Sequence, residues 1–342
     1  MEYGLGIASS RCAPRRVIGR AAAWVTRAVI LLSLFSSIVA AAPGEVPDQA
    51  SVKERPFVVV LGIAQDGGYP QAGCRKECCR KAWSDPSRRR WVASLGIVDP
   101  AGWRRYLIDA TPDFREQLSM LDKIAPVAAS PGLDGIFLTH GHIGHYTGLM
   151  QLGREVMGAH EVPVYVMPRM AGFLKTSGPW DQLVKLDNVS LRPLEAEQPV
   201  RLGNISVKAL AVPHRDEYTE TAGFVVRGPS RAVLYLPDID KWSRWSTPLA
   251  DALAGVDVAY LDGTFFGERE LPGRNMAEIP HPLITETITL LSKLPPAQRA
   301  KVRFLHLNHT NPALDSASAA ARAILSAGMR VAVQGEKEFL GP

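Results

Sequence analysis

Cysteine is scarce in this chain: four occur among 342 residues, and three of them, Cys74, Cys78 and Cys79, stand close together. Three thiols cannot all pair, so this cluster holds one disulfide plus a free thiol or a metal ion. Cys74 can bond to either neighbour, whereas a bond between the vicinal Cys78 and Cys79 would be strained. For the alternative, a structural metal site, no fourth ligand is evident nearby.

Long apolar runs are rare as well. The one that stands out, residues 28–42, has 15 residues, fewer than the roughly 20 that a membrane span needs. It follows four arginines and ends in three alanines, a pattern typical of a secretory signal peptide over residues 1–42. An uncleaved membrane anchor is the alternative. We therefore expect an exported protein, periplasmic or extracellular, with a linker at residues 43–55 and no stable membrane span after leader cleavage.

The mature chain also lacks an excess of charge of either sign. Without the five Arg and one Glu of residues 1–42, the 39 basic and 34 acidic side chains become 34 and 33, a formal net charge of +1. No polybasic surface remains to bind a nucleic acid. The expected partner is a small-molecule substrate, and the sequence does not indicate an oligomeric state.

The remaining sequence predicts an α/β (or α+β) domain over residues 56–342. Short β-rich runs recur along it, with helical patterns between several of them. Strands are expected at residues 56–64, 91–98, 105–108, 135–138, 163–167, 205–212, 223–227, 232–236, 256–261, 302–307 and 330–333, and the clearest helices at 148–157, 283–294 and 316–327. One catalytic domain with two β-sheets is the simplest interpretation.

Histidine is scarce too, with eight in the chain, yet His140, His142 and His145 all fall within the segment LTHGHIGHYTG. This segment directly follows a predicted strand. Imidazole nitrogens bind zinc at about 2 Å, and the two glycines allow the backbone to turn tightly around an ion. We expect His140 and His142 to bind one metal ion and His145 to face a second.

Further histidines stand at or beyond the ends of predicted strands, namely His214, His281, His306 and His309. Strand ends are rigid and the loops that leave them can converge, so distant segments can build one metal site. Asp238 follows the strand of AVLYLPDID and can bridge two cations, although a simple turn residue is the alternative.

The order of these residues resembles the metallo-β-lactamase superfamily. Its signature is a strand ending in Thr-His-x-His-x-Asp-His, followed by a lone histidine, a bridging aspartate and a final histidine. The resemblance implies a four-layer αβ/βα sandwich of two mixed β-sheets flanked by helices. It assigns the metal ligands as His140, His142, His145, His214, Asp238 and His306. The segments VVLGIAQDGGYPQAGC, YLIDATPDF, YLDGTFF and HLNHTNP look most similar to the pyrroloquinoline quinone biosynthesis protein B-like and ribonuclease Z-like groups.

Two further histidines have roles implied by the same resemblance. His281 resembles a histidine that lies near the leaving group in ribonuclease Z-like enzymes, but it could equally just precede a helix that starts at the next proline. In HLNHTNP, the resemblance favours His306 as the final ligand and leaves His309 to line the pocket.

One position departs from the family pattern, because Gly144 stands where the family has the aspartate of the second ion. The second ion is therefore expected to bind weakly, and Gly144→Asp is expected to tighten it. Asp66 in AQDGGYP or Asp262 in YLDGTFF could instead supply the missing oxygen. For Asp66 a turn beside two glycines is the favoured interpretation, while Asp262 could cap a turn or orient a ligand histidine.

These residues predict a metal-dependent hydrolase with one or two zinc ions. Zinc would acidify a water molecule that attacks an ester, lactam, lactone or phosphodiester bond. Asp238 would hold the ion, and His281 would protonate the leaving group. The alternatives are a redox or cofactor-maturation role, as in the quinone-biosynthesis group, and a metal-binding protein without turnover.

Overall fold

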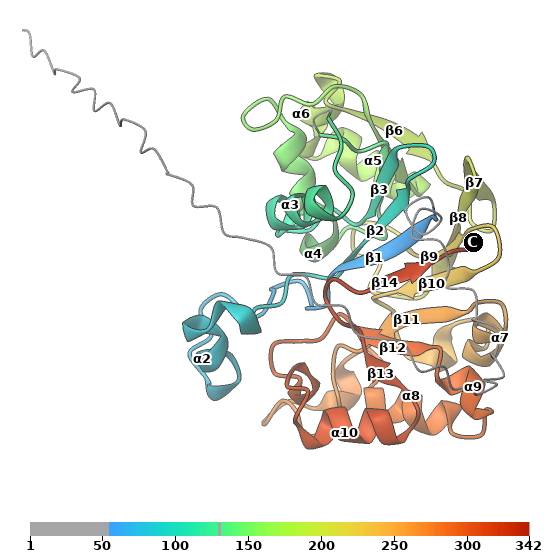
Figure 1. The fold of residues 1–342 in the computed structure, drawn as a ribbon. Coiled ribbons are helices and arrows are strands. Elements are labelled where there is room, and N and C mark those ends of the chain that lie inside the picture. The colour runs from blue at the N-terminus through green and yellow to red at the C-terminus, as the bar shows by residue number, and fades with distance from the viewer. Residues whose placement is uncertain (1–54, 129–130, 342) are drawn as a thin grey trace, which may run out of the picture. The chain divides into compact units, whose positions relative to one another are not determined.

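The computed structural model describes residues 55–128 and 131–341. The predicted signal peptide and all of the predicted linker except its last residue lie outside the described residues. Within the described residues, no helix is both long and apolar enough to cross a membrane. The domain consists of two seven-stranded β-sheets with helices around them (Figure 1).

The first sheet has an antiparallel half and a parallel half, in the order β14-β1-β2-β3-β4-β5-β6. Its strands are β1 (Phe57–Gly62), β2 (Ser94–Asp99), β3 (Arg104–Ile108), β4 (Gly135–Phe137), β5 (Val162–Val166), β6 (Val189–Pro193) and β14 (Lys337–Phe339). Pairing is antiparallel from β14 to β3 and parallel from β3 to β6. The sequence FVVVLG of β1 is buried throughout, as expected for a strand covered on both faces.

The second sheet repeats this plan in the order β13-β12-β11-β10-β9-β8-β7. Its strands are β7 (Pro199–Leu202), β8 (Ile205–Val212), β9 (Thr221–Arg227), β10 (Ala232–Leu236), β11 (Val258–Asp262), β12 (Val302–Leu305) and β13 (Arg330–Val331). Pairing is parallel from β10 to β13 and antiparallel from β7 to β10. The carboxyl ends of β8, β10, β11 and β12 therefore share one edge of this sheet.

Among the described residues, three large apolar cores separate four layers. The central core joins both sheets, with Phe137 of β4 and Phe224 of β9 in edge-on contact at 5.7 Å between ring centroids. The outer cores bury the far face of each sheet under helices. The helices are α2 (Glu77–Ser84), α3 (Phe114–Ile124), α4 (Ile143–Tyr146), α5 (Pro168–Thr176), α6 (Trp180–Lys185), α7 (Leu249–Ala254), α8 (Ile284–Leu291), α9 (Pro296–Arg299) and α10 (Ala319–Ser326). The architecture confirms the predicted sandwich of two mixed sheets.

Most predicted elements are present, but not all. The predicted helix at residues 148–157 is wrong, because a 3-10 helix, η2 (Thr147–Leu152), ends at Gly153, whose backbone is extended. The strands β6, β7 and β14 were not predicted. They lie at or near the edges of their sheets, where partial exposure weakens the apolar pattern of a strand.

Candidate metal centre

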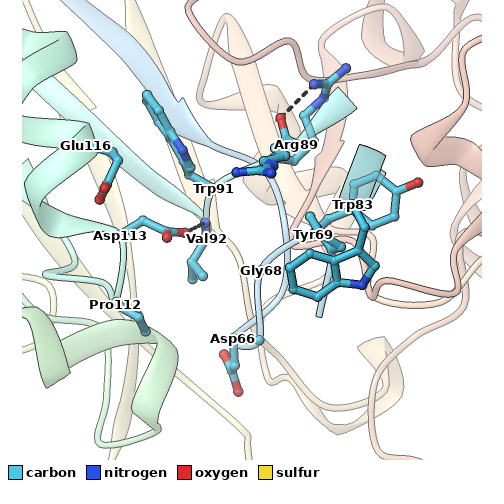
Figure 2. A pocket seen from close by; sticks show the side chains of 13 residues that line it. Asp66, Gly68, Tyr69, Trp83, Arg89, Trp91, Val92, Pro112, Asp113 and Glu116 are labelled. Atoms are coloured by element: carbon cyan, nitrogen blue, oxygen red, sulfur yellow. Dashed lines mark hydrogen bonds between the residues drawn. The ribbon is translucent and has the colours of Figure 1, made fainter. Parts of the chain in front are cut away.

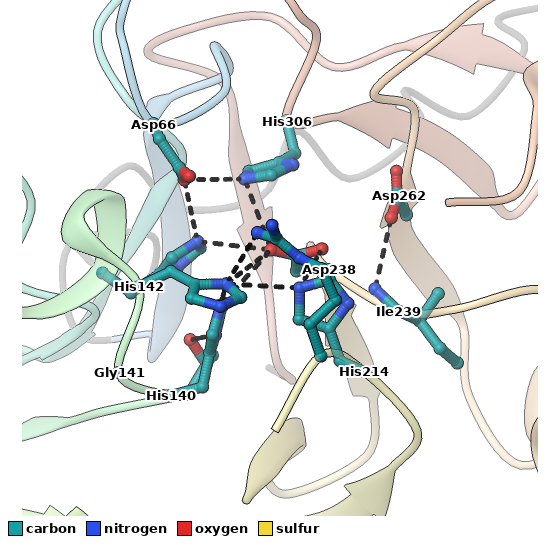
Figure 3. Close-up of polar contacts among 12 residues, drawn as sticks. Asp66, His140, Gly141, His142, His214, Asp238, Ile239, Asp262 and His306 are labelled. Atoms are coloured by element: carbon teal, nitrogen blue, oxygen red, sulfur yellow. Dashed lines mark hydrogen bonds and ion pairs between the residues drawn. The ribbon is translucent and has the colours of Figure 1, made fainter. Parts of the chain in front are cut away.

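Seven side chains that can bind metals meet where strands of both sheets end (Figure 3). They follow β1, β4, β8, β10 and β12, and they are Asp66, His140, His142, His145, His214, Asp238 and His306. Because each follows a strand of the packed sheets, the ligands are held on a rigid framework. The set contains the six residues that the family resemblance assigned as ligands, together with Asp66.

Three histidines and Asp238 form the first group. Nε2 of His140 lies 2.8 Å from Nδ1 of His142, which is 3.2 Å from Nε2 of His214. The two oxygens of Asp238 lie 3.3 Å from Nε2 of His140 and 3.2 Å from Nε2 of His214. Four donors thus surround one position that a single metal ion could occupy.

Asp66, His145 and His306 form the second group, on another side of Asp238. Oδ1 of Asp66 lies 3.3 Å from Nε2 of His145 and 3.3 Å from Nε2 of His306. Oδ2 of Asp238 lies 3.8 Å and 4.0 Å from the same two nitrogens. Asp238 therefore faces both groups, the arrangement that a bridging carboxylate requires. Asp66 does lie in a turn, as predicted, but the turn interpretation missed that its carboxylate faces the histidines.

Hydrogen bonds on the far side of two rings decide which nitrogen faces the centre. Nδ1 of His145 lies 2.8 Å from Oδ2 of Asp109, and Nδ1 of His306 lies 3.0 Å from Oγ1 of Thr264. These partners leave Nε2 facing inward, as is usual for metal-binding histidines. His306 and Asp109 also have positive φ angles of 59° and 68°, which non-glycine residues rarely adopt outside constrained sites.

The donors of both groups fit zinc. Two ligands bound to a tetrahedral zinc at about 2.05 Å lie roughly 3.3 Å apart, close to the separations above. Nε2 of His145 and Oδ1 of Asp238 are buried without a hydrogen-bond partner, so a cation would satisfy atoms that the protein leaves unsatisfied. Imidazole and carboxylate are also the donors that zinc accepts in catalytic sites.

The electrostatics of the centre favour the forms that bind metals. Burial opposes ionisation of Asp238, but the surrounding histidines outweigh burial and hold the pKa of Asp238 well below its usual range. The same balance lowers the pKa of Asp66. Burial lowers the pKa of His140, which keeps its ring neutral. Burial also opposes protonation of His145, but neighbouring carboxylates outweigh burial and raise its pKa, so His145 would release a proton on binding a metal.

His281 lies beside Asp238, outside the two groups. Its Nδ1 is 2.8 Å from Oδ2 of Asp262 and 3.2 Å from Oδ1 of Asp238. Burial opposes its protonation, but these carboxylates raise the pKa of His281 to about 9. Asp262 also accepts hydrogen bonds from Thr264 and from the backbone N–H of Ile239. Asp262 thus contacts His281 and, with Asp238 and His281, forms a third group that could hold a metal ion, but it does not join Asp66, His145 and His306.

The three cysteines form a separate group with His309. Sγ of Cys78 lies 3.8 Å from Sγ of Cys74, and Nδ1 of His309 lies 3.4 Å from Sγ of Cys79. All three thiols are free in the structure, which fits the second of the two predicted alternatives, a structural metal site, better than a disulfide. The four donors are close enough to share one metal ion. His309 thus supplies a fourth donor that could complete this group; the sequence did not reveal this neighbour because 230 residues separate His309 from Cys79.

A cavity of about 290 Å³ opens beside Asp66 (Figure 2). Trp83 and Arg89 lie on one side of it in this view, and Trp91 and Glu116 on the other. Aromatic faces with a few charged groups suit a small organic ligand that carries polar groups. Asp66 belongs both to the wall of this cavity and to the second group of ligands.

Comparison with known sequences agrees with this architecture. The model of the Beta-lactamase superfamily domain matches residues 104–335. The Coenzyme PQQ synthesis protein B of Xanthomonas campestris pv. campestris is 27% identical over 302 residues, covering 81% of this chain and 98% of the relative. The protein of the same name from Methylobacterium nodulans is 29% identical over 309 residues, covering 81% and 97%.

Solved structures show the same fold. The Zn(2+)-bound PqqB from Methylobacterium extorquens gives a TM-score of 0.70 at 24% identity, covering 82% of this chain and 99% of that chain. A diphosphatase from the PhnP family gives a TM-score of 0.57 at 24% identity, covering 83% and 96%. The family match spans more than half of the chain, and the paired mixed sheets agree with it. This chain therefore belongs to the β-lactamase superfamily, as its resemblance to the metallo-β-lactamases implied.

Proposed function

We propose that the protein is a zinc-dependent hydrolase. One observation carries the proposal: two groups of histidines flank the buried carboxylate of Asp238 at separations that fit zinc. Zinc bound there would act as a Lewis acid: it would lower the pKa of a bound water molecule to about 7 and polarise the bond under attack. The Zn(2+) bound by the PqqB of Methylobacterium extorquens supports this choice of metal.

The chain's own residues would do the remaining work. Asp238 is 2% exposed, and its oxygens face both groups, so it would hold the ions and set their spacing. Asp262 occupies Nδ1 of His281, which leaves Nε2 of His281 to protonate a leaving group. Glu217 lies 2.9 Å from Nε2 of His142 and would hold that ring in its ligating orientation.

The bond that is cleaved is proposed as an ester, lactam, lactone or phosphodiester of a small molecule. The diphosphatase that shares this fold supports hydrolysis in general. The test is to purify the full chain without chelator, measure its zinc content, and assay turnover on all four bond classes. We expect turnover on at least one class, lost after chelation and restored by zinc. Zinc-loaded protein that cleaves none of the four would refute the proposal.

A role like that of Coenzyme PQQ synthesis protein B is the second candidate. The identity of 27% over 81% of this chain supports it. Under this candidate the metal centre would serve the maturation of a redox cofactor. Wild-type protein, but not His142→Ala, would then restore cofactor production in a strain that lacks its own synthesis protein B. Metal binding with neither activity would indicate a non-catalytic relative.

Export belongs to the proposal as well. We propose a signal peptide at residues 1–42, a linker at 43–55 and a single domain at 56–342, in the periplasm or outside the cell. The apolar run and its upstream arginines support this division. The mature chain should begin between residues 41 and 44, so N-terminal sequencing that returns an intact leader would contradict it.

A further inference from the structure

Gly144, in α4 next to His145, stands where the family signature has the aspartate of the second ion. A Cβ atom placed on Gly144 would overlap Oδ1 of Asp66 and would lie 2.7 Å from its Cα and 2.8 Å from its Cγ. Real Cβ atoms essentially never approach other heavy atoms as closely as this. No side chain fits at position 144 while Asp66 keeps its place.

The backbone holds Asp66 firmly in that place. The N–H of Gln65 donates to the carbonyl of Leu307 at 2.9 Å, and the N–H of Leu307 donates to the carbonyl of Ile63 at 2.8 Å. These two bonds join the loop after β1 to the residue that follows His306. The side chain of Asp66 is thereby delivered to its position beside His306 and His145.

We propose that Asp66 is the carboxylate ligand of a second zinc ion, replacing the aspartate that the family carries at position 144. The inference deepens the proposed function and rests on its metal dependence. Asp66 and Asp238 together place two negative charges beside two divalent cations, whose mutual repulsion at about 3.5–4 Å needs such neutralisation. The centre therefore binds two zinc ions tightly, not one tightly and one weakly.

A second observation points to a cation at the same place. Nε2 of His145 is buried and has no hydrogen-bond partner, although Oδ1 of Asp66 is only 3.3 Å away. Two atoms at this distance without hydrogen-bond geometry are arranged as neighbouring ligands of one ion. The same geometry reverses the expectation for Gly144→Asp: a side chain there collides with Asp66, so this variant should weaken the second ion.

The experiment uses metal-free full-length protein, titrated with zinc by calorimetry and then dialysed to measure bound zinc. Wild type should retain one equivalent of zinc in the group formed by the three cysteines and His309, and two tightly bound equivalents of zinc at the histidine centre. Asp66→Asn keeps the size of the side chain and removes its charge. Because loss of even an outer partner weakens metal sites by 10–100-fold, we expect this variant to bind one centre equivalent about 100-fold more weakly or worse.

Two further variants test whether the effect is specific to the position of the Asp66 carboxylate. Glu116→Gln removes a carboxylate from the wall of the same cavity and should leave all equivalents in place. Gly144→Ala should weaken the same equivalent as Asp66→Asn, because its methyl group displaces Asp66. If Asp66→Asn keeps both centre equivalents at wild-type affinity, or if wild type binds one tightly and one weakly, the inference is overturned.

The outcome also separates this inference from the proposed function. Wild type that binds two ions, with one lost in Asp66→Asn, but that hydrolyses none of the four bond classes would refute hydrolysis and leave the ligand assignment standing. Turnover by wild type together with unaltered zinc binding in Asp66→Asn would support hydrolysis and refute the assignment of Asp66 as a ligand.

Discussion

Replacing His142 with alanine tests the metal centre most directly. Nδ1 of His142 lies 2.8 Å from Nε2 of His140 and 3.2 Å from Nε2 of His214, so the variant removes one of four donors around a single position. Loss of an outer partner costs 10–100-fold in metal affinity, so loss of a ligand should cost about 100-fold or more. That factor corresponds to about 2.7 kcal/mol of binding free energy.

The fold should tolerate this change. The side chain of His142 is 12% exposed, and its other partner, Glu217, is 47% exposed, so truncation opens little buried space. We expect the free energy of unfolding of the metal-free variant to fall by less than about 1 kcal/mol. With excess zinc, the stabilisation that wild type gains from binding at this position should be largely absent.

The measurements are bound zinc after dialysis and denaturant unfolding with and without chelator. His160→Ala is the matched control, because the side chain of His160 is 79% exposed and pairs with the adjacent Glu161, which is not a ligand; this variant should bind zinc like wild type. Stoichiometric zinc in His142→Ala would refute the assignment of this residue as a ligand. Unfolding of the metal-free variant would refute the reasoning about its burial.

Three further predictions follow from the same structure. Burial raises the pKa of Glu270 from 4.5 to about 7, so the folded state favours the protonated carboxyl group. The stability that this protonated group contributes is full below about pH 4.5 and is lost as the pH rises towards 7. The loss amounts to about 2–3 kcal/mol after allowing for the partial exposure of the side chain. Glu270→Gln should flatten the pH dependence of urea unfolding across this range, and an unchanged curve would contradict the assignment. His281→Ala should lower kcat by about 100-fold or more with zinc content intact, whereas loss of zinc would show that His281 is a ligand. Cys79→Ser should remove the zinc equivalent held with His309. It should also weaken binding of the second ion at the centre, because the two loops that carry the cysteine group also carry Asp66 and His306. Unaltered zinc content by metal analysis would rule out the cysteine site.

The sequence alone was sufficient for the main elements of the fold. Buried strands such as β8 and β10 were predicted with the bounds that the structure has, because an apolar or alternating run of this length has few other conformations. His214 after β8 and Asp238 after β10 were predicted to belong to one metal site, because strand ends are rigid and the loops that leave them can converge. The short strands β6, β7 and β14 were not predicted, since pairing at a sheet edge depends on neighbours more than on local pattern.

Only the tertiary structure decided which carboxylates and thiols complete the sites. Asp66 is a turn residue in the sequence, and 240 residues separate it from His306, beside which the fold places it. Asp262 is also an aspartate at the end of a strand and was an equal candidate for the missing ligand, yet the fold places it against His281. His309 joins the cysteines across 230 residues. Local sequence determines what a side chain can bind, but the loops that bring such groups within about 3 Å of one another are set by packing between distant segments, which no local pattern encodes.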